Sequence, residues 1–331
     1  MAYDNLKLDK GLYTCQKGFN AALEAIDPSD NYIGTNMEGL DAYQRQLKRF
    51  DIKVSGANSD TVSKFFSTSD SAALFPEYIS RAVRQGIDDT NIVDKLIASK
   101  TNIDSLDYRA IESVSADEND YIGAINEGAF IPETRIKTKD TLTSLHKRGR
   151  MLTASYEAIK SQKLDVFTVA LKQIGEYISA CQLVDFLNVL STQGSIHTIS
   201  YTDSSKGVQY KDIVNLWNEL APYNMTTILA DTDSIGKLLN IEEFKDSAAG
   251  LTFHGTGNPI TPMGADMVRV PKKIGDIGII GLDKNYAMEM VQFGDVVTDF
   301  DKLIDRQLER ASITATAGFS PIFRDAALML Q

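Results

Sequence analysis

The sequence predicts an α+β protein in which one long helix supports several strands and an extended loop leaves the folded body. An amphipathic pattern without proline runs from about Leu164 to Ser191. Before it, the stretch from Asp107 to Met151 has no compact hydrophobic pattern. After it, short helices and strand-like segments fill residues 198–331. A loop longer than about 12–15 residues is uncommon inside a compact domain and is usually functional or disordered.

The composition is that of a folded, acidic protein. The chain has 331 residues, enough for about two domains with a core that needs no disulfide or metal. The 34 Lys and Arg residues against 45 Asp and Glu residues give a net charge of −11. This balance argues against a surface built to bind nucleic acid or an anionic membrane. An acidic wall would instead keep nearby DNA from adhering.

The sequence shows no targeting or membrane-spanning segment. Its first residues, MAYDNLKLDKGLY, contain no basic segment followed by an apolar run. No stretch approaches the ~18 consecutive apolar residues of a membrane span. Cys15 and Cys181 are far apart, and each falls on an apolar helical stripe. We therefore expect synthesis in a reducing cytoplasm and two buried structural thiols.

Residues 1–74 are predicted to be a helical extension. Two short helices, 12–26 and 40–50, each carry an apolar stripe without an obvious partner in their own segment. We expect these stripes to dock against the same or a neighbouring copy through Leu12, Phe19, Ile26, Leu40, Tyr43 and Leu47. Deletion of residues 1–55 is then expected to leave a folded body.

The segment that follows is predicted to be a linker and a short helix. Residues 55–76 are rich in Ser, Thr and Asp, which is typical of a linker around one short turn. A helix is expected from Glu77 to Gln85, and Gly86 is expected to end it.

The extended loop is divided by charge. Its first limb, 112–133, is acidic through Glu112, Asp117, Glu118, Asp120, Glu127 and Glu133. Its second limb, 135–150, is basic apart from Asp140, through Arg135, Lys137, Lys139, Lys147, Arg148 and Arg150. The last three could form a solvated strand edge, but the opposing acidic limb favours contact with another copy. We expect a two-stranded hairpin over 107–151, which is marginally stable alone and needs that neighbour.

The long helix is predicted to pack against a sheet. Its core residues are expected to be Phe167, Leu171, Ile174 and Ile178. At 1.5 Å per residue the helix would be about 40 Å long. A coiled-coil strand is the alternative, but the stripe widens toward the C-terminal half, and this favours a sheet.

Two further modules complete the chain. Residues 199–275 are predicted to be a small α/β module with a helix from Tyr210 to Leu220 and a buried strand at 226–230. Asp231 or Asp233 is expected to cap the next helix. From residue 276 the pattern alternates as in strands.

No set of residues predicts catalysis, a cofactor or a metal site. Residues 231–242 partly match a calcium loop, but Ile235 stands where an oxygen ligand is needed, so helix capping is the better explanation. The fragment HGTGNP (254–259) is not set between a strand and a helix, as a phosphate-binding loop requires. Ser155 and Glu157 are typical of a helix N-terminus. The histidines lack metal-ligand spacing: His146, His197 and His254.

With these elements in order, residues 75–331 resemble the major capsid proteins of tailed double-stranded-DNA bacteriophages. Three stretches carry the resemblance: NIVDKLIASKTNIDSLDYRAIES (91–113), LHKRGRMLTASYEAIKSQKLDVFTVALKQIGEYISACQLVDFLNVLSTQG (145–194) and GIIGLDKNYAMEMVQFGDVVTDFDKLIDRQLERASITATAGFSPIFRDAALML (278–330). The resemblance lies in the order and spacing of elements. It implies the tailed-phage capsid fold, which encapsulins share.

The resemblance also implies a domain organisation. We expect an N-terminal extension and arm at 1–74, the start of a peripheral domain at 75–104, an extended β-hairpin loop at 105–152, a spine helix within 153–198, an axial domain at 199–275 and closing strands of the peripheral domain at 276–331. In some members the N-terminal region is a scaffold that is cleaved off; here we expect it to be retained.

The implied function is structural. Copies would assemble as pentamers and hexamers into an icosahedral virion shell around double-stranded DNA, inside a bacterial cytoplasm and without membrane or cofactor. Portal, scaffolding and decoration proteins are the expected partners. The alternatives are an encapsulin-like cellular compartment and, in another class, a cytosolic α+β enzyme or binding protein of low oligomeric state. Size exclusion separates the classes, because a shell runs far above the 36.5 kDa monomer.

Overall fold

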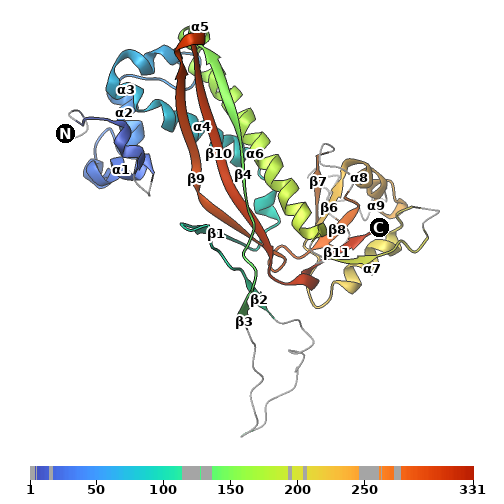
Figure 1. Cartoon of the computed structure of the whole chain (residues 1–331). Helices are drawn as coiled ribbons and strands as arrows, with labels where there is room; N and C mark the ends of the chain where they lie inside the picture. Colours follow the sequence, from blue (N-terminus) through green and yellow to red (C-terminus); the bar gives the residue numbers. More distant parts are fainter. Residues whose placement is uncertain are drawn as a thin grey trace. The chain divides into compact units, whose positions relative to one another are not determined.

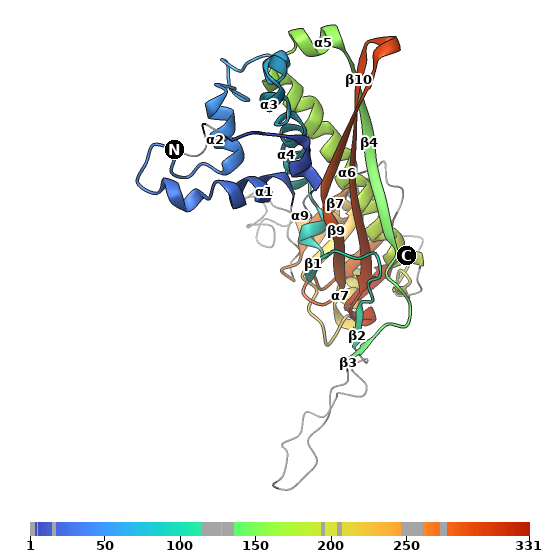
Figure 2. The same cartoon turned by 60° about the vertical axis from the view of Figure 1, so that its left-hand side comes forward.

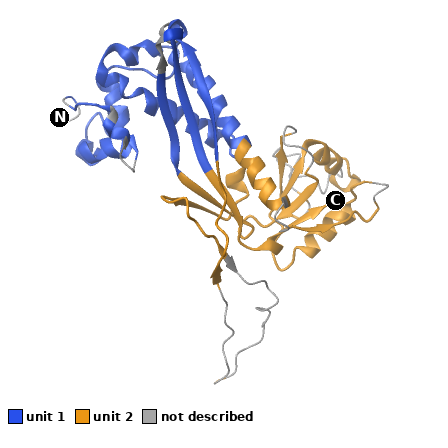
Figure 3. Ribbon diagram, viewed as in Figure 1, with its two compact units in different colours: residues 1–91, 147–180, 294–316 blue, residues 92–146, 181–293, 317–331 orange. Residues whose placement is uncertain are grey.

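The computed structural model describes residues 4, 6–14, 18–113, 127, 136–192, 196–203, 207–245, 261, 263–271 and 277–331. The chain forms two compact units (Figure 3). Unit 1 comprises Met1–Asn91, Lys147–Ala180 and Gly294–Thr316, and unit 2 comprises Ile92–His146, Cys181–Phe293 and Ala317–Gln331. None of the helices in the described ranges is long and apolar enough to cross a membrane.

Unit 1 contains most of the helical residues. Its N-terminal part holds η2 (Lys10–Thr14), α1 (Phe19–Ile26), η3 (Ser29–Tyr32), α2 (Ala42–Arg49), η4 (Val62–Ser67), α3 (Ser69–Ala72) and α4 (Phe75–Asp89). These are followed by α5 (Tyr156–Ser161) and α6 (Leu164–Thr192). The C-terminal turns of α6, from Cys181 on, belong to unit 2. The long helix thus occupies almost the range expected from the sequence.

A four-stranded sheet has the order β1-β9-β10-β4. Its strands are β1 (Ser99–Ile103), β4 (Leu145–Ser155), β9 (Met288–Leu303) and β10 (Leu308–Pro321), with η8 (Ile304–Arg306) between β9 and β10. In unit 1, α4 and α6 pack on one face of the long strands through residues such as Ile174, Val296 and Ile313 (Figures 1 and 2). The expected packing of the long helix on a sheet is confirmed.

The N-terminal helices are part of the core of unit 1. Phe19 on α1 and Tyr43 and Leu47 on α2 are buried in the same apolar cluster as α4 and α6. The Arg81 guanidinium on α4 binds Asp41 at 2.6 Å and lies over the Tyr43 ring at 4.3 Å. The two stripes therefore have partners within their own chain, which sequence periodicity could not reveal.

Residues 55–76 are not a linker. They contain η4 and α3, in which Val62 and Phe65 are fully buried, and the Phe65 ring packs against those of Phe75 and Tyr78 on α4. Their Ser and Thr residues serve as caps: the Thr68 hydroxyl accepts a hydrogen bond from the Ser71 amide at 3.1 Å. The composition was typical of a linker because capping residues and linker residues are the same types.

Gly86 does not end α4, which continues to Asp89. A Cβ atom at Gly86 would lie 2.3 Å from the Lys172 carbonyl oxygen, and one at Gly175 would lie 2.2 Å from that of Val83. The two glycines let the backbones of α4 and α6 touch, so the helix keeps a residue that is intrinsically unfavourable there. The predicted first helix also begins later, at Phe19, because Gly18 has a φ of 83°.

Unit 2 holds the remaining elements: η5 (Val93–Lys95), β2 (Ile111–Ser113), β3 (Ile136–Thr138), β5 (His197–Ile199), α7 (Tyr210–Glu219), β6 (Thr227–Asp231), α8 (Thr232–Leu239), α9 (Glu242–Lys245), β7 (Asp266–Val270), β8 (Ile279–Leu282), η9 (Arg324–Ala326) and β11 (Ala327–Leu330). A five-stranded sheet has the order β5-β11-β8-β6-β7. Two of its strands, β8 and β11, come from the closing segment of the chain.

The helices of unit 2 begin as the sequence predicts. The Asp231 carboxylate accepts a hydrogen bond from the Asp233 amide at 3.1 Å and caps α8. Similarly, in unit 1 the Ser155 hydroxyl accepts from the Ala158 amide and caps α5. β6 is buried along its whole length between β7 and β8.

Cys181, expected to be buried, is only half-buried, and Cys15 lies outside the described residues.

Candidate assembly surface

The described part of the extended loop is a short two-stranded ribbon with an exposed apolar face. β2 and β3 pair antiparallel, with Ile111 opposite Thr138 and Ser113 opposite Ile136. Opposite residues share a face, so both isoleucines lie on one side of the ribbon. Ile111 is 49% exposed and Ile136 is 68% exposed. Within this chain nothing described covers that face, so water meets apolar surface there.

The charged residues of the loop fall in three groups. Asp117, Glu118, Asp120 and Arg135 lie outside the described residues, as does Glu133. Glu112 is opposite Lys137 on the ribbon, and Lys137 and Glu127 are exposed. On β4, Lys147 is exposed as well. Lys137, Glu127 and Lys147 thus have the accessibility that a contact with another copy requires.

Three basic residues of the loop instead contact their own chain. The Lys139 amine donates to the Ser320 hydroxyl at 2.9 Å and to the Pro321 carbonyl at 2.6 Å. The Arg150 guanidinium lies 3.9 Å from the centroid of the Tyr177 ring on α6. Arg148 is half-buried and also has a partner. Arg150 keeps an exposed side chain despite this contact, whereas Lys139 and Arg148 are half-buried. Charge alone could not predict these differences, since they depend on residues far away in the sequence.

The other predicted residues divide between core and surface. Phe167, Leu171, Ile174 and Ile178 all lie in the core of unit 1. In the N-terminal region Phe19, Tyr43 and Leu47 are buried, Leu12 and Leu40 are half-buried, and Ile26 is exposed.

A row of exposed apolar residues on a second side of α6 was not predicted from the sequence. Val166, Val169 and Tyr177 follow a helical spacing and are exposed, Val169 by 67%. Met151 on β4 is exposed too. The signal was present in the sequence: apolar residues on α6 are not confined to one stripe. A helix that is apolar on more than one side is typically buried on more than one side.

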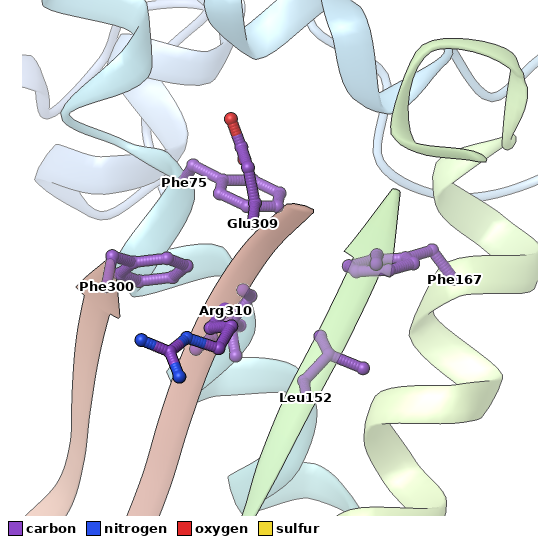
Figure 4. Close-up of a pocket in the computed structure, with 9 residues that line it drawn as sticks. Phe75, Leu152, Phe167, Phe300, Glu309 and Arg310 are labelled. Carbon is purple, nitrogen blue, oxygen red and sulfur yellow. The ribbon is translucent and has the colours of Figure 1, made fainter. Parts of the chain in front are cut away.

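The described residues of unit 2 line a cavity of about 530 Å³, with Asp94, Asp266 and Lys284 among its lining residues. The pocket in Figure 4 lies in unit 1 and is lined mainly by apolar groups, including Phe75, Phe167 and Phe300. Its volume is about 10 Å³, at most enough for about one water molecule. Among the described residues no group of three or more His, Cys, Asp or Glu side chains could hold a metal ion.

Comparison with known proteins identifies the fold. No family model matches the sequence, and no curated protein matches it. Solved structures do match. A virus-like particle from Pyrococcus furiosus is 14% identical, with a TM-score of 0.52, over 78% of this chain and 99% of that one. The capsid of a native GTA particle is 14% identical, with a TM-score of 0.55, over 73% and 89%.

A third structure extends the comparison. A phage-related protein from Bordetella bronchiseptica RB50 is 8% identical, with a TM-score of 0.55, over 77% of this chain and 96% of that one. The three similar structures include a capsid and a virus-like particle. The chain therefore has the capsid fold, and the predicted fold class is confirmed.

Proposed function

We propose that this protein is the structural subunit of an icosahedral capsid that encloses packaged double-stranded DNA. The observation that carries the proposal is the fold, which matches 89% to 99% of the length of two shell-forming chains. Fold alone does not imply function. The surfaces of the chain add support, because the β2–β3 ribbon and the second side of α6 both present apolar residues that a single copy leaves in water.

The same surfaces suggest how copies interact. A two-stranded ribbon is marginal in water unless something supports it, so the extended loop is proposed to lie on a neighbouring copy. Its exposed charges, Lys137, Lys147 and Glu127, together with Glu112, Asp117, Glu118, Asp120 and Arg135, are proposed to set register with that copy. Charge complementarity of this kind fixes orientation more than affinity.

The proposed domain roles rest on the resemblance to capsid proteins. Residues 199–275 would form the axial domain at the centre of each pentamer or hexamer, and the spine helix and long strands would form the peripheral domain. The role is mechanical, and we propose no catalysis. Portal, scaffolding and decoration proteins are the partners such a shell would use, in a virion assembled in a bacterial cytoplasm. The net charge of −11 fits DNA that is enclosed but not bound.

A cellular compartment is the second candidate, and the matches to known structures do not favour it over a capsid. The two candidates make the same shell and differ in its contents. The capsid resemblance rests on residues 75–331. The helices α1 and α2, which pack in the core of unit 1, lie outside that range.

Size exclusion and nuclease treatment of the particle test the proposal. Protein purified from its native source should elute far above 36.5 kDa and should protect double-stranded DNA from added nuclease. Particles that hold protein cargo and no protected DNA would support the compartment instead. Elution as a monomer at all concentrations would contradict both.

A further inference from the structure

The root of the extended loop is tied to the body of unit 2 at two points. On the outgoing limb, the Tyr108 hydroxyl donates to Glu289 Oε1 on β9 at 2.7 Å. On the returning limb, the Lys139 amine donates to the Pro321 carbonyl at 2.6 Å and to the Ser320 hydroxyl at 2.9 Å, at the end of β10. The two anchors thus hold opposite limbs to two neighbouring strands of the sheet.

The limbs are also joined to each other. The Lys139 amide donates to the Ala110 carbonyl, and the Thr143 amide donates to the Tyr108 carbonyl, both at 2.9 Å. Ala110 and Thr143 are buried. Tyr108 and Lys139 therefore each hold the body with the side chain and the opposite limb with the backbone.

Glu289 makes the first anchor firm. The residue is only 7% exposed, and a buried carboxylate is costly unless hydrogen bonds satisfy it. Thr101 on β1 donates to the same Oε1 atom at 2.6 Å. Since β1 pairs with β9 beside Glu289, Thr101 holds the carboxylate from within the sheet, in addition to Tyr108. Hydrogen bonds to an ionised acceptor are stronger than neutral ones.

The strands of the loop are too short to do the same work. β2 and β3 pair over three residues each, and an isolated two-stranded hairpin is marginally stable at best. We propose that the direction in which the extended loop leaves the body is fixed by the Tyr108–Glu289 and Lys139–Pro321 anchors at its root, rather than by the pairing of its own strands. A loop with a fixed root meets a neighbouring copy already oriented, which lowers the cost of ordering it on contact.

Hydrogen–deuterium exchange on the full-length chain tests the anchors. The variants are Tyr108→Phe and Lys139→Met, compared on the same size-exclusion fraction as the unaltered protein. Matched controls are Tyr286→Phe and Lys284→Met, which alter exposed residues elsewhere in unit 2. Loss of one anchor should accelerate exchange of the root amides, 107–110 and 139–143, about tenfold, while β6 and β8 exchange as before.

The coupling between the limbs makes the test specific. Because each limb is bonded to the other, either variant should loosen both limbs. Acceleration confined to the substituted limb, or no acceleration, would overturn the proposal. Glu289→Gln keeps an oxygen acceptor and should accelerate exchange less than Tyr108→Phe. If Tyr108→Phe also accelerates the exchange of amides in β6 and β8, the variant has loosened the whole unit. Lys139→Met then decides the question, because it leaves the hydrogen bonds of the buried Glu289 carboxylate in place.

The consequence for assembly rests on the proposed function. A double variant that combines Tyr108→Phe with Lys139→Met should give fewer or misshapen particles in electron micrographs. The two control variants should assemble normally. If the unaltered protein forms no particles, the proposed function fails, but the exchange measurement still decides whether the anchors exist.

Discussion

At the scale of single residues, two glycines determine how closely α4 and α6 approach. Gly86 and Gly175 face the backbone of the opposite helix, and a methyl group at either position would overlap a carbonyl oxygen. Backbone atoms cannot yield as the end of a side chain can. The contact between the helices therefore depends on the absence of two Cβ atoms.

We expect Gly175→Ala to destabilise the protein by about 1–3 kcal/mol or more, because the added methyl forces the helices apart. The matched control is Gly236→Ala on α8, where no atom beyond the adjacent residues and the backbone of its own helix lies within 4 Å of the new Cβ. This substitution should be neutral or stabilising by up to about 1 kcal/mol. Denaturant unfolding measures both. Equal effects of the two substitutions would show that the glycine contact is misassigned.

Asp212 is a buried carboxylate that organises the start of α7. It accepts hydrogen bonds from the Thr202 amide at 2.8 Å and the Gln209 amide at 2.9 Å. Burial alone would raise its pKa, but these hydrogen bonds, with Lys211 nearby, hold the pKa below the usual value. The ionised form is therefore bound more tightly in the folded state than in the unfolded one.

We expect Asp212→Asn to lower the free energy of unfolding at pH 7 by about 1–3 kcal/mol. Since the folded-state pKa is below the unfolded one, the contribution of Asp212 is complete above the unfolded pKa of about 3.9 and is lost as pH falls through the folded pKa. The variant should thus lose less stability than the unaltered protein between pH 5 and acid. Parallel curves would contradict this role, and the exposed Asp266→Asn serves as control.

Sequence patterns predicted single residues well where the cause is local. Asp231 and Ser155 cap helices as expected, because capping depends on a few adjacent residues. Gly86 was predicted wrongly, since its role is set by Lys172 on a distant segment. Lys139 and Lys137 are two residues apart and alike in sequence, yet only Lys139 reaches the end of β10.

At the scale of elements, α6 has two different apolar sides. Ile174 is buried against the sheet, whereas Val169 faces water. We expect Ile174→Asp to give insoluble protein, because an unpaired carboxylate in the core is poorly tolerated. Val169→Asp should leave the chain folded and soluble but reduce assembly. Soluble expression and circular dichroism separate the two, and a folded Ile174→Asp variant would show the core side to be misassigned.

The N-terminal helices are built into unit 1, and this reverses the expected result of deleting residues 1–55. Removal would uncover apolar groups on α4, because the core of unit 1 would lose four side chains: Phe19, Leu23, Tyr43 and Leu47. It would also leave Arg81 without Asp41. We predict aggregation of the shortened chain. Recovery of a soluble, folded body, judged by gel filtration and a cooperative melt, would restore the view of a separable extension.

The order of elements and the packing of α6 on a sheet could be predicted from the sequence, but the other partners could not. The range of α6 and the strands of the closing segment follow from periodicity, which is a property of neighbouring residues. Residues 55–76 were misjudged because their contacts with α4 and α6 are long-range. For the same reason, the sequence left open whether α1 and α2 dock on their own chain or on a neighbouring copy, and the structure shows the first.

At the scale of the whole molecule, the capsid fold could be predicted from the sequence because it depends on the order of the elements. That order is kept although the chain is only 8% to 14% identical to the structures that share the fold. Assembly surfaces are harder to predict, since an apolar residue in the sequence can be core or interface. The structure separates them: Ile111, Ile136, Val166 and Val169 are exposed in the single chain, and an assembled shell would cover them.

Electron microscopy of the purified full-length protein tests the central claim most directly. We predict closed particles of icosahedral symmetry, in which the subunit density fits both compact units and the β2–β3 ribbon contacts a neighbouring copy. We also predict continuous density for α1 and α2 on their own unit 1. A uniform population of separate 36.5 kDa chains under every condition of salt and concentration would contradict the claim.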